Sequence, residues 1–146
     1  MSRELFTVGY EGRTVDELIA HLRSKNVNCV IDVRQVPFSR KPGFSKNKLA
    51  QTLRRTKIDY VHLGDLGAPK ALREDLKLTG DYSAFFQQMD RYLAGKKDTI
   101  EEVYRYVMNG RCCLMCFERL AAKCHRKIVA NRIRARDGDG LQIKHV

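Results

Sequence analysis

The chain has 146 residues with 28 Lys or Arg against 17 Asp or Glu, so its formal net charge is +11. This length fits one domain with a normal hydrophobic core, and we expect a single domain over residues 1–146. The mean hydropathy of −0.45 and the lack of an apolar run of about 20 residues argue against a membrane-spanning helix. Because the first residues lead directly into a strand-like run and carry no secretory signal, we expect a cytoplasmic protein without a membrane partner.

The N-terminal part of the chain has the pattern of a βαβ unit. Residues 5–8 form a short apolar and β-branched run that ends at Gly9, which predicts a strand. Thr14 and Glu17 form a capping box, and apolar residues at helical spacing follow them, which predicts a helix. Residues 29–33 predict a second strand that is apolar on both faces, as buried parallel strands are.

The middle of the chain continues with a loop, a weak helix and a third strand. Pro37, Pro42 and Gly43 interrupt regular structure and predict the loop. Residues 46–57 then carry a weaker helical pattern, which favours a helix. Residues 59–63 predict the third strand.

Two helical patterns follow before the cysteine-rich segment. Apolar and aromatic residues between 82 and 93 fall on one helical stripe, which is more typical of core packing than of a base-stacking surface. Residues 98–109 have a second helical pattern, with Asp98 as the expected N-cap and Glu101 completing a capping box.

The C-terminal part predicts a buried strand and then a basic helix. Residues 112–116 predict the fourth strand, and residues 119–136 predict a long helix that ends at the Asp-Gly-Asp-Gly sequence 137–140. Residues 142–146 can form a last short strand. The order of elements therefore predicts an α/β fold: a single domain with a mainly parallel sheet of four to five strands and helices on both faces.

Polar and titratable residues stand where the predicted strands end. Asp32 and Arg34 close the second strand, His62 closes the third, and Cys116 and Glu118 close the fourth. Open α/β folds bind their ligands at the carboxyl edge of the sheet. If the strands are parallel, these side chains gather at one edge and form a candidate site.

Two basic stretches without a single acidic residue suggest a polyanionic partner. Residues 34–57 contain eight Lys or Arg, and residues 119–136 contain seven. Such stretches are typical of phosphate or nucleic-acid contacts, although a solvated helix face explains the second stretch equally well. We expect nucleic acid or a nucleotide as the partner. The residues expected to bind its phosphate are Arg34, Ser39, Arg40, Lys41 and Arg126.

Four of the five cysteines lie between residues 112 and 124. Together with His125, the residues Cys113, Cys116 and Cys124 offer four zinc ligands, but their spacing is not that of a usual zinc site. Strand alternation turns Cys113 and Cys116 to opposite faces, and Cys124 falls on the apolar face of the predicted helix. We therefore predict no stoichiometric metal and no cofactor. The alternative is a thiolate at Cys116 with His125 or Glu118 as proton carrier.

Several motifs, taken in their order, resemble the domain of unknown function 488 family. They include Thr7-Val8-Gly9-Tyr10, Asp32-Val33-Arg34, Pro37-Phe38-Ser39-Arg40, Tyr60-Val61-His62-Leu63, Cys113-Leu114-Met115-Cys116-Phe117-Glu118 and Cys124-His125-Arg126. The resemblance covers most of the chain and implies a compact α/β fold, but it implies no particular reaction. The positions that it picks out are Asp32, Arg34, Ser39, Arg40, Cys116, Glu118, Cys124, His125 and Arg126.

Three functions fit these patterns. The first is a pocket for the phosphate of a nucleotide or nucleic acid, and it leaves open whether the protein is an enzyme. The second is a non-catalytic nucleic-acid-binding module that uses both basic stretches. The third is a zinc-stabilised structural domain. For the first function the candidate catalytic residues are Asp32, Cys116, Glu118 and His125. The sequence leaves the substrate and the oligomeric state open.

Overall fold

Five parallel strands organise the chain in the computed structural model, which describes residues 3–138 and 140–146. The strands are β1 (Glu4–Gly9), β2 (Cys29–Asp32), β3 (Asp59–His62), β4 (Cys112–Cys116) and β5 (Gln142–His145). Their spatial order is β3-β2-β4-β1-β5, and every neighbouring pair runs parallel. The prediction of an α/β domain with a mainly parallel sheet is therefore confirmed.

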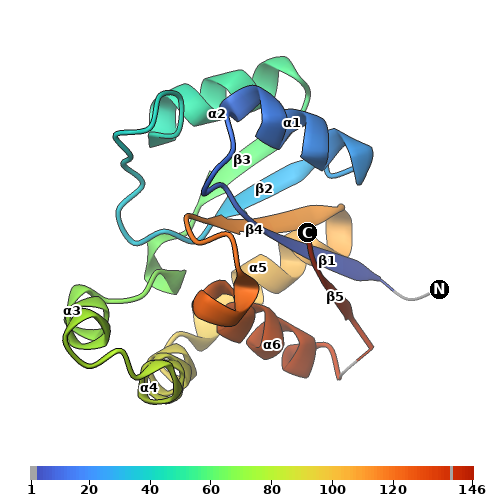
Figure 1. Ribbon diagram of the computed structural model, residues 1–146. Coiled ribbons are helices and arrows are strands. Elements are labelled where there is room, and N and C mark those ends of the chain that lie inside the picture. The colour runs from blue at the N-terminus through green and yellow to red at the C-terminus, as the bar shows by residue number, and fades with distance from the viewer. Residues whose placement is uncertain (1–2, 139) are drawn as a thin grey trace.

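Helices cover both faces of the sheet, as predicted (Figure 1). On one face lie α1 (Val15–Ser24) and α2 (Lys46–Arg55), and on the other lie α3 (Lys70–Thr79), α4 (Tyr82–Ala94), α5 (Lys97–Asn109) and α6 (Arg126–Arg136). Each face has its own hydrophobic core. Alternation along β4 divides its side chains between the two cores, so that Cys113 and Cys116 lie on opposite faces as predicted. Among the described residues, no helix is long and apolar enough to cross a bilayer.

Local signals placed α1 correctly. The Thr14 hydroxyl accepts a hydrogen bond from the Glu17 backbone N–H at 3.1 Å, and the Glu17 carboxylate accepts one from the Thr14 N–H at 2.9 Å. This is the predicted capping box, which satisfies two backbone donors that the first turn leaves free. Leu18 and Leu22, one turn apart, are then buried against the sheet.

One predicted helix start was wrong, and one helix was not predicted. Helix α5 begins at Lys97 with Lys96 as its N-cap, so Asp98 lies inside the first turn and does not cap the helix. An acid there still interacts favourably with the helix dipole. Helix α3 was not predicted at all. It buries no residue completely, and Leu72 and Leu76 alone pack against the core, so its apolar pattern is weak.

The predicted helix over residues 119–136 is interrupted. A short 3-10 helix, η2 (Ala121–Lys123), comes first, Cys124 has an extended backbone, and α6 begins only at Arg126. The carbonyl oxygens of Glu118 and Arg119 accept hydrogen bonds from the Arg126 guanidinium. Those carbonyls therefore point at a side chain and not along a helix, which explains why the helix starts late.

The strand order creates a crevice at the carboxyl edge between β2 and β4. These strands are neighbours, yet the chain leaves β2 towards α2 on one face and leaves β4 towards α6 on the other (Figure 1). Ligands of open α/β folds bind where the connections diverge in this way.

Candidate functional site

A cavity of about 560 Å³ opens at this edge of the sheet. Its walls come from the loop after β2, the segment after β4, and helices α3 and α4. Sites for small molecules usually have volumes of about 300–1,000 Å³. Of the residues predicted for the site, those that line the cavity are Arg34, Ser39, Cys116, Glu118 and His125.

Asp32 and Arg34 form a buried ion pair at the base of the cavity. The Asp32 carboxylate is fully buried and accepts hydrogen bonds from Arg34 Nη2 at 2.7 Å and from Nε at 2.9 Å. The Tyr60 hydroxyl also donates to Asp32, at 2.5 Å. Burial by itself lowers the pKa of the Arg34 guanidinium, but its hydrogen bonds with Asp32 and the Asp32 charge outweigh burial and raise it. Burial and then Asp32 raise the pKa of Tyr60.

This pairing gives Asp32 and Arg34 different roles. Asp32 does not line the cavity, whereas Arg34 does and is 7% exposed. Arg34 Nη1 donates a hydrogen bond to the Tyr10 hydroxyl at 3.2 Å, and Nη1 and Nη2 still carry N–H groups beyond those used internally. Asp32 therefore fixes the orientation of one edge of the guanidinium, and the other edge faces the cavity.

Arg126 lies in the interior and does not line the cavity. Its side chain is 1% exposed. Nε donates to the Thr7 hydroxyl at 3.0 Å, Nη1 donates to the Glu118 carbonyl at 2.5 Å, and Nη2 donates to the Arg119 carbonyl at 3.1 Å. These contacts make Arg126 a clamp between β1 and the segment after β4. Of these two arginines, the structure thus brings Arg34 to the cavity, but not Arg126.

Cys116, Cys124 and His125 form a buried cluster beside the cavity, which we call the Cys–Cys–His cluster. Their sulfur and nitrogen ligand atoms all lie within 4.8 Å of one another. The structure pairs Cys116 and Cys124 as a disulfide, with Cα atoms 7.7 Å apart. The sequence placed Cys124 on a helix face, but the late start of α6 leaves it in the extended segment that faces Cys116.

The imidazole of His125 is held in one orientation and one tautomer. Nε2 lies 2.9 Å from the Val33 carbonyl oxygen, which can only accept, so Nε2 carries the proton. Nδ1 then keeps a lone pair and lies 3.7 Å from Cys124 Sγ. Burial lowers the pKa of His125 to about 4, against the opposing effect of the Val33 hydrogen bond. His125 is therefore neutral near pH 7.

Glu118 is the single carboxylate among the lining residues that the structure describes. Its side chain is exposed, and Oε2 lies 3.6 Å from Cys116 Sγ. At this distance a reduced Cys116 can donate a weak hydrogen bond to the carboxylate. A thiol beside a carboxylate at a cavity wall can act as a nucleophile with a proton acceptor.

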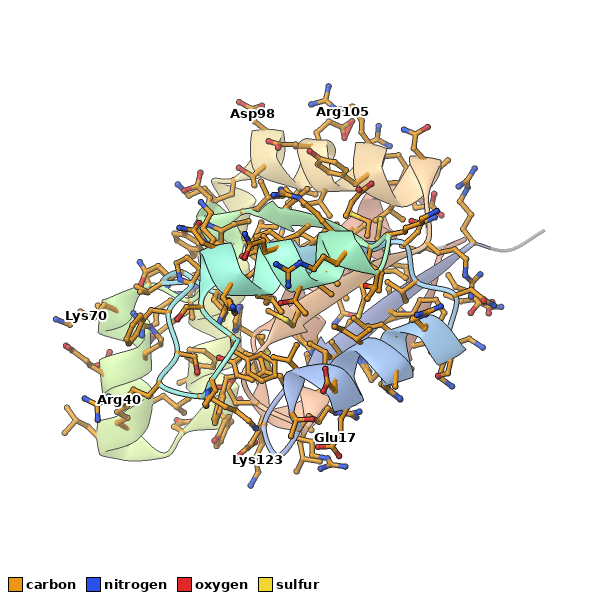
Figure 2. All side chains as sticks on the ribbon, turned by 90° about the horizontal axis from the view of Figure 1, so that it is seen from above. Glu17, Arg40, Lys70, Asp98, Arg105 and Lys123 are labelled. Atoms are coloured by element: carbon orange, nitrogen blue, oxygen red, sulfur yellow. A yellow bond between two sulfur atoms is a disulfide. The ribbon has the colours of Figure 1, made fainter. Side chains whose placement is uncertain are left out.

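The donor-rich loop contributes less to the cavity than the sequence suggested. Ser39 lines the cavity, and its hydroxyl accepts from the Lys41 backbone N–H at 3.1 Å. Lys41 Nζ donates to the Tyr10 carbonyl at 3.3 Å. The exposed Arg40 reaches outward from the loop and is not among the lining residues (Figure 2).

Three further cations that line the cavity were not among the residues expected to bind phosphate, although Lys123 belongs to the second basic stretch. Arg73 and Lys77 come from α3, and Lys123 comes from η2 (Figure 2 labels Lys123). Arg73 Nη2 donates to the Gln35 side chain at 2.7 Å. The signal that could have found Arg73 and Lys77 is the pair of leucines one turn apart in α3, which orients this helix against the core.

Three aromatic side chains at the cavity remain partly in water. Phe38 is 66% exposed, Phe117 is 45% exposed and Tyr82 is 38% exposed. Tyr82 belongs to the stripe that was predicted to pack in the core, where Phe85, Met89 and Leu93 are indeed buried. By contrast, Phe44 is fully buried and stacks on Tyr10 with ring centroids 4.3 Å apart.

The two basic stretches differ in how their charges are used. On α6, Arg132 pairs with Asp90 at 2.7 Å and Arg136 pairs with Glu101 at 2.6 Å. In the same stretch Lys127 lies over the Phe86 ring, and Arg126 is the buried clamp. The first stretch instead presents the exposed Lys46, Lys48, Arg54 and Arg55 on α2. Contacts within the protein therefore occupy much of the second stretch.

Comparison with known proteins yields one family match. The model of the family described as "Domain of unknown function DUF488" matches residues 14–133, which include every element from α1 to β4. No curated protein and no solved structure matches the chain.

Proposed function

Because the chain belongs to the domain of unknown function 488 family, whose description states no activity, we propose a function from the cavity: it binds a nucleotide. In this proposal, cations at the cavity wall hold the phosphate groups, and the exposed aromatic rings stack on the base. The observation that carries the proposal is the combination of both kinds of side chain around one cavity of about 560 Å³.

The charge of the cavity wall supports a phosphate ligand. Arg34, Arg73, Lys77 and Lys123 face a single carboxylate, that of Glu118, among the described lining residues. Arginine presents a planar fork of donors that matches phosphate oxygens, and lysine adds a point charge. Arg34 is already oriented by Asp32, so it loses little conformational freedom when a ligand binds.

The aromatic residues support a base next to the phosphate. Phe38, Phe117 and Tyr82 are large apolar side chains left partly in water, which favours a function for them beyond packing. Stacking of a base on an aromatic side chain contributes about 1–3 kcal/mol and tolerates different bases. The Phe117 ring is steadied by an edge contact with Tyr10, at a centroid distance of 5.4 Å.

Catalysis on such a ligand would involve Cys116 and Glu118. Both line the cavity, and their sulfur and oxygen atoms are 3.6 Å apart. Their proposed roles are nucleophile and proton acceptor. Asp32 and His125 have structural partners instead: Asp32 holds Arg34, and the His125 Nε2–H is bonded to the Val33 carbonyl.

The test is calorimetric titration at low salt with AMP, ATP, adenosine and inorganic phosphate. We expect AMP and ATP to bind. Adenosine and inorganic phosphate should bind much more weakly, because adenosine lacks the phosphate contacts and phosphate lacks the base contacts. Lys77→Ala should lower the affinity for ATP roughly 10- to 100-fold, since hydrogen bonds to charged groups contribute about 1.5–3 kcal/mol. Phe117→Ala should lower the affinities for AMP and ATP by the same factor, because both ligands carry the base on which this ring is proposed to stack.

Matched controls lie on the same segments. Lys70→Ala removes an exposed lysine of α3 that is not among the lining residues, and Leu120→Ala removes an exposed apolar side chain near Phe117. Both should leave nucleotide affinity unchanged. If no nucleotide binds, or if Lys70→Ala and Lys77→Ala have equal effects, the cavity is not a nucleotide site.

A second candidate function, nucleic-acid binding, is favoured by the α2 surface. Lys46, Lys48, Arg54 and Arg55 are exposed on one short helix that contains no acid. If α2 contacts phosphates, the logarithm of affinity for DNA or RNA should fall nearly linearly with the logarithm of salt concentration. The double variant Lys46→Ala/Lys48→Ala should flatten that slope, and Lys77→Ala should not. Absence of binding at low salt would remove this candidate.

A further inference from the structure

The Cys–Cys–His cluster has features that neither the nucleotide proposal nor disulfide pairing explains. Cys116 ends β4, while Cys124 and His125 directly precede α6. All three are buried, and their ligand atoms lie within 4.8 Å of one another. Two sulfurs and one imidazole nitrogen at this separation are a ligand set typical of zinc.

The hydrogen bond of His125 favours a metal ligand. Its Nε2–H donates to the Val33 carbonyl at 2.9 Å, so the lone pair is on Nδ1, which faces Cys124 Sγ at 3.7 Å. Histidines that bind metals almost always donate their other ring N–H to a carbonyl or carboxylate in this way. The bond sets both the tautomer and the direction of the free nitrogen.

Hydrogen-bond donors point at both sulfur atoms. The Arg126 backbone N–H lies 3.4 Å from Cys124 Sγ, and Arg126 Nη1 lies 3.3 Å from Cys116 Sγ. Donors and a positive charge stabilise a thiolate, which is the form of cysteine that binds metals. Arg126, whose guanidinium is bonded to one hydroxyl and two main-chain oxygens, thus also provides a hydrogen-bond donor to each of the two sulfurs.

The backbone separation of the two cysteines fits a shared ligand better than a direct bond. Their Cα atoms are 7.7 Å apart, and disulfides usually span about 4.4–6.8 Å. This separation is wider than the usual span of a disulfide, and a metal ion between the two sulfurs accommodates a wider one. The sequence argument against zinc rested on Cys113 and Cys116, which do lie on opposite faces of the sheet; the structure places Cys124 beside Cys116 instead.

We propose that Cys116, Cys124 and His125 of the reduced protein bind one Zn²⁺ ion. These residues supply three of the four ligands of a tetrahedral zinc, and Cys116 and His125 also line the cavity. Catalytic zinc sites have three protein ligands and keep the fourth position for water or substrate, and the contact of Cys116 and His125 with the cavity is compatible with such a site. The Glu118 carboxylate is near the proposed site, with Oε2 3.6 Å from Cys116 Sγ. The proposal goes beyond nucleotide binding and does not depend on it, but it takes the place of the nucleophilic role proposed for Cys116, because the thiolate is then a metal ligand.

The test begins with protein purified under reducing, anaerobic conditions, stripped with a chelator and titrated with Zn²⁺ or Co²⁺ alone. We expect one ion per chain, and for Co²⁺ a thiolate-to-metal charge-transfer band together with tetrahedral d–d absorption. Cys116→Ala, Cys124→Ala and His125→Ala should each lose these bands or shift them. Cys113→Ala is the matched control, because Cys113 is equally buried on the same strand but faces the other core.

A second measurement on the wild-type protein avoids variants that fail to fold. Alkylation of the native protein followed by mass mapping should show that Zn²⁺ protects Cys116 and Cys124 from modification. Failure to bind Zn²⁺ or Co²⁺ stoichiometrically overturns the proposal. So does binding that Cys113→Ala abolishes, or a Cys116–Cys124 pair that persists as a disulfide in the presence of reductant. Nucleotide titrations of the stripped protein report separately on the cavity, so failure of one proposal is distinguishable from failure of the other.

Discussion

Replacing Asp32 with asparagine tests whether the ion pair under the cavity is as deeply buried as the structure shows. The carboxylate is 0% exposed and accepts hydrogen bonds from Arg34 and from Tyr60. Asparagine has nearly the same shape, but it removes the charge and places an amide donor among other donors. The Arg34 guanidinium, 7% exposed, is then left without its counterion.

The expected cost of Asp32→Asn is large. Removing one partner of a buried ion pair costs about 3–5 kcal/mol of unfolding free energy. A domain of this kind has a total stability of about 5–15 kcal/mol, so the melting temperature should fall by on the order of 10 °C. The double variant Asp32→Asn/Arg34→Met should recover most of the loss, because it removes the unpaired charge as well.

The assay is urea denaturation followed by circular dichroism, with Asp90→Asn as the matched control. Asp90 pairs with Arg132 at the same 2.7 Å distance, but its side chain is 54% exposed. Exposed pairs contribute about 0–1 kcal/mol, so the control should unfold nearly as the wild type does. If Asp32→Asn lowers the free energy of unfolding no more than Asp90→Asn does, burial does not make the Asp32–Arg34 pair more important than an exposed pair, and the prediction is refuted. Nucleotide affinity should fall with Asp32→Asn, although Asp32 does not line the cavity.

Three further predictions concern single positions. Glu118→Gln should change stability by less than about 0.5 kcal/mol, because the side chain is exposed. It should also tighten nucleotide binding, and weaker binding in calorimetry would contradict the electrostatic argument. Gly9→Ala should lower the free energy of unfolding, measured by urea denaturation, by about 1–3 kcal/mol or more, because a Cβ would overlap the Glu118 carbonyl. Gly95→Ala, where a Cβ meets nothing closer than 3.5 Å, should be tolerated, and equal losses would exclude the overlap. Thr14→Ala should lower the unfolding free energy by about 0.5–2 kcal/mol through loss of the N-cap, and an unchanged urea midpoint would mean that the cap contributes nothing.

The fold could be predicted because its signals are local. The capping box of Thr14 and Glu17 depends on residues three positions apart, and the structure contains it. Runs that are apolar on both faces became the central strands β2 and β4. Parallel strands then bring Arg34, Cys116 and Glu118 to one cavity, as the strand-end argument expected.

Local patterns were misleading where distant contacts decide. A continuous helix over residues 119–136 satisfied the apolar spacing, but the Glu118 and Arg119 carbonyls bond the Arg126 side chain instead. Helix α3 carried too few apolar residues to be recognised, although it supplies Arg73 and Lys77 to the cavity.

The sequence by itself determined the strands, most helices and the edge of the sheet where the site lies. The tertiary structure alone decided which residues meet there. It placed Cys124, expected on a helix face, beside Cys116, and it buried Arg126, whose charge the sequence assigned to a ligand. The physical reason is that spacing along the chain encodes only interactions between near neighbours. The partners of a sulfur or a guanidinium depend on strand order and on where a helix begins, and both are set by packing of the whole sheet.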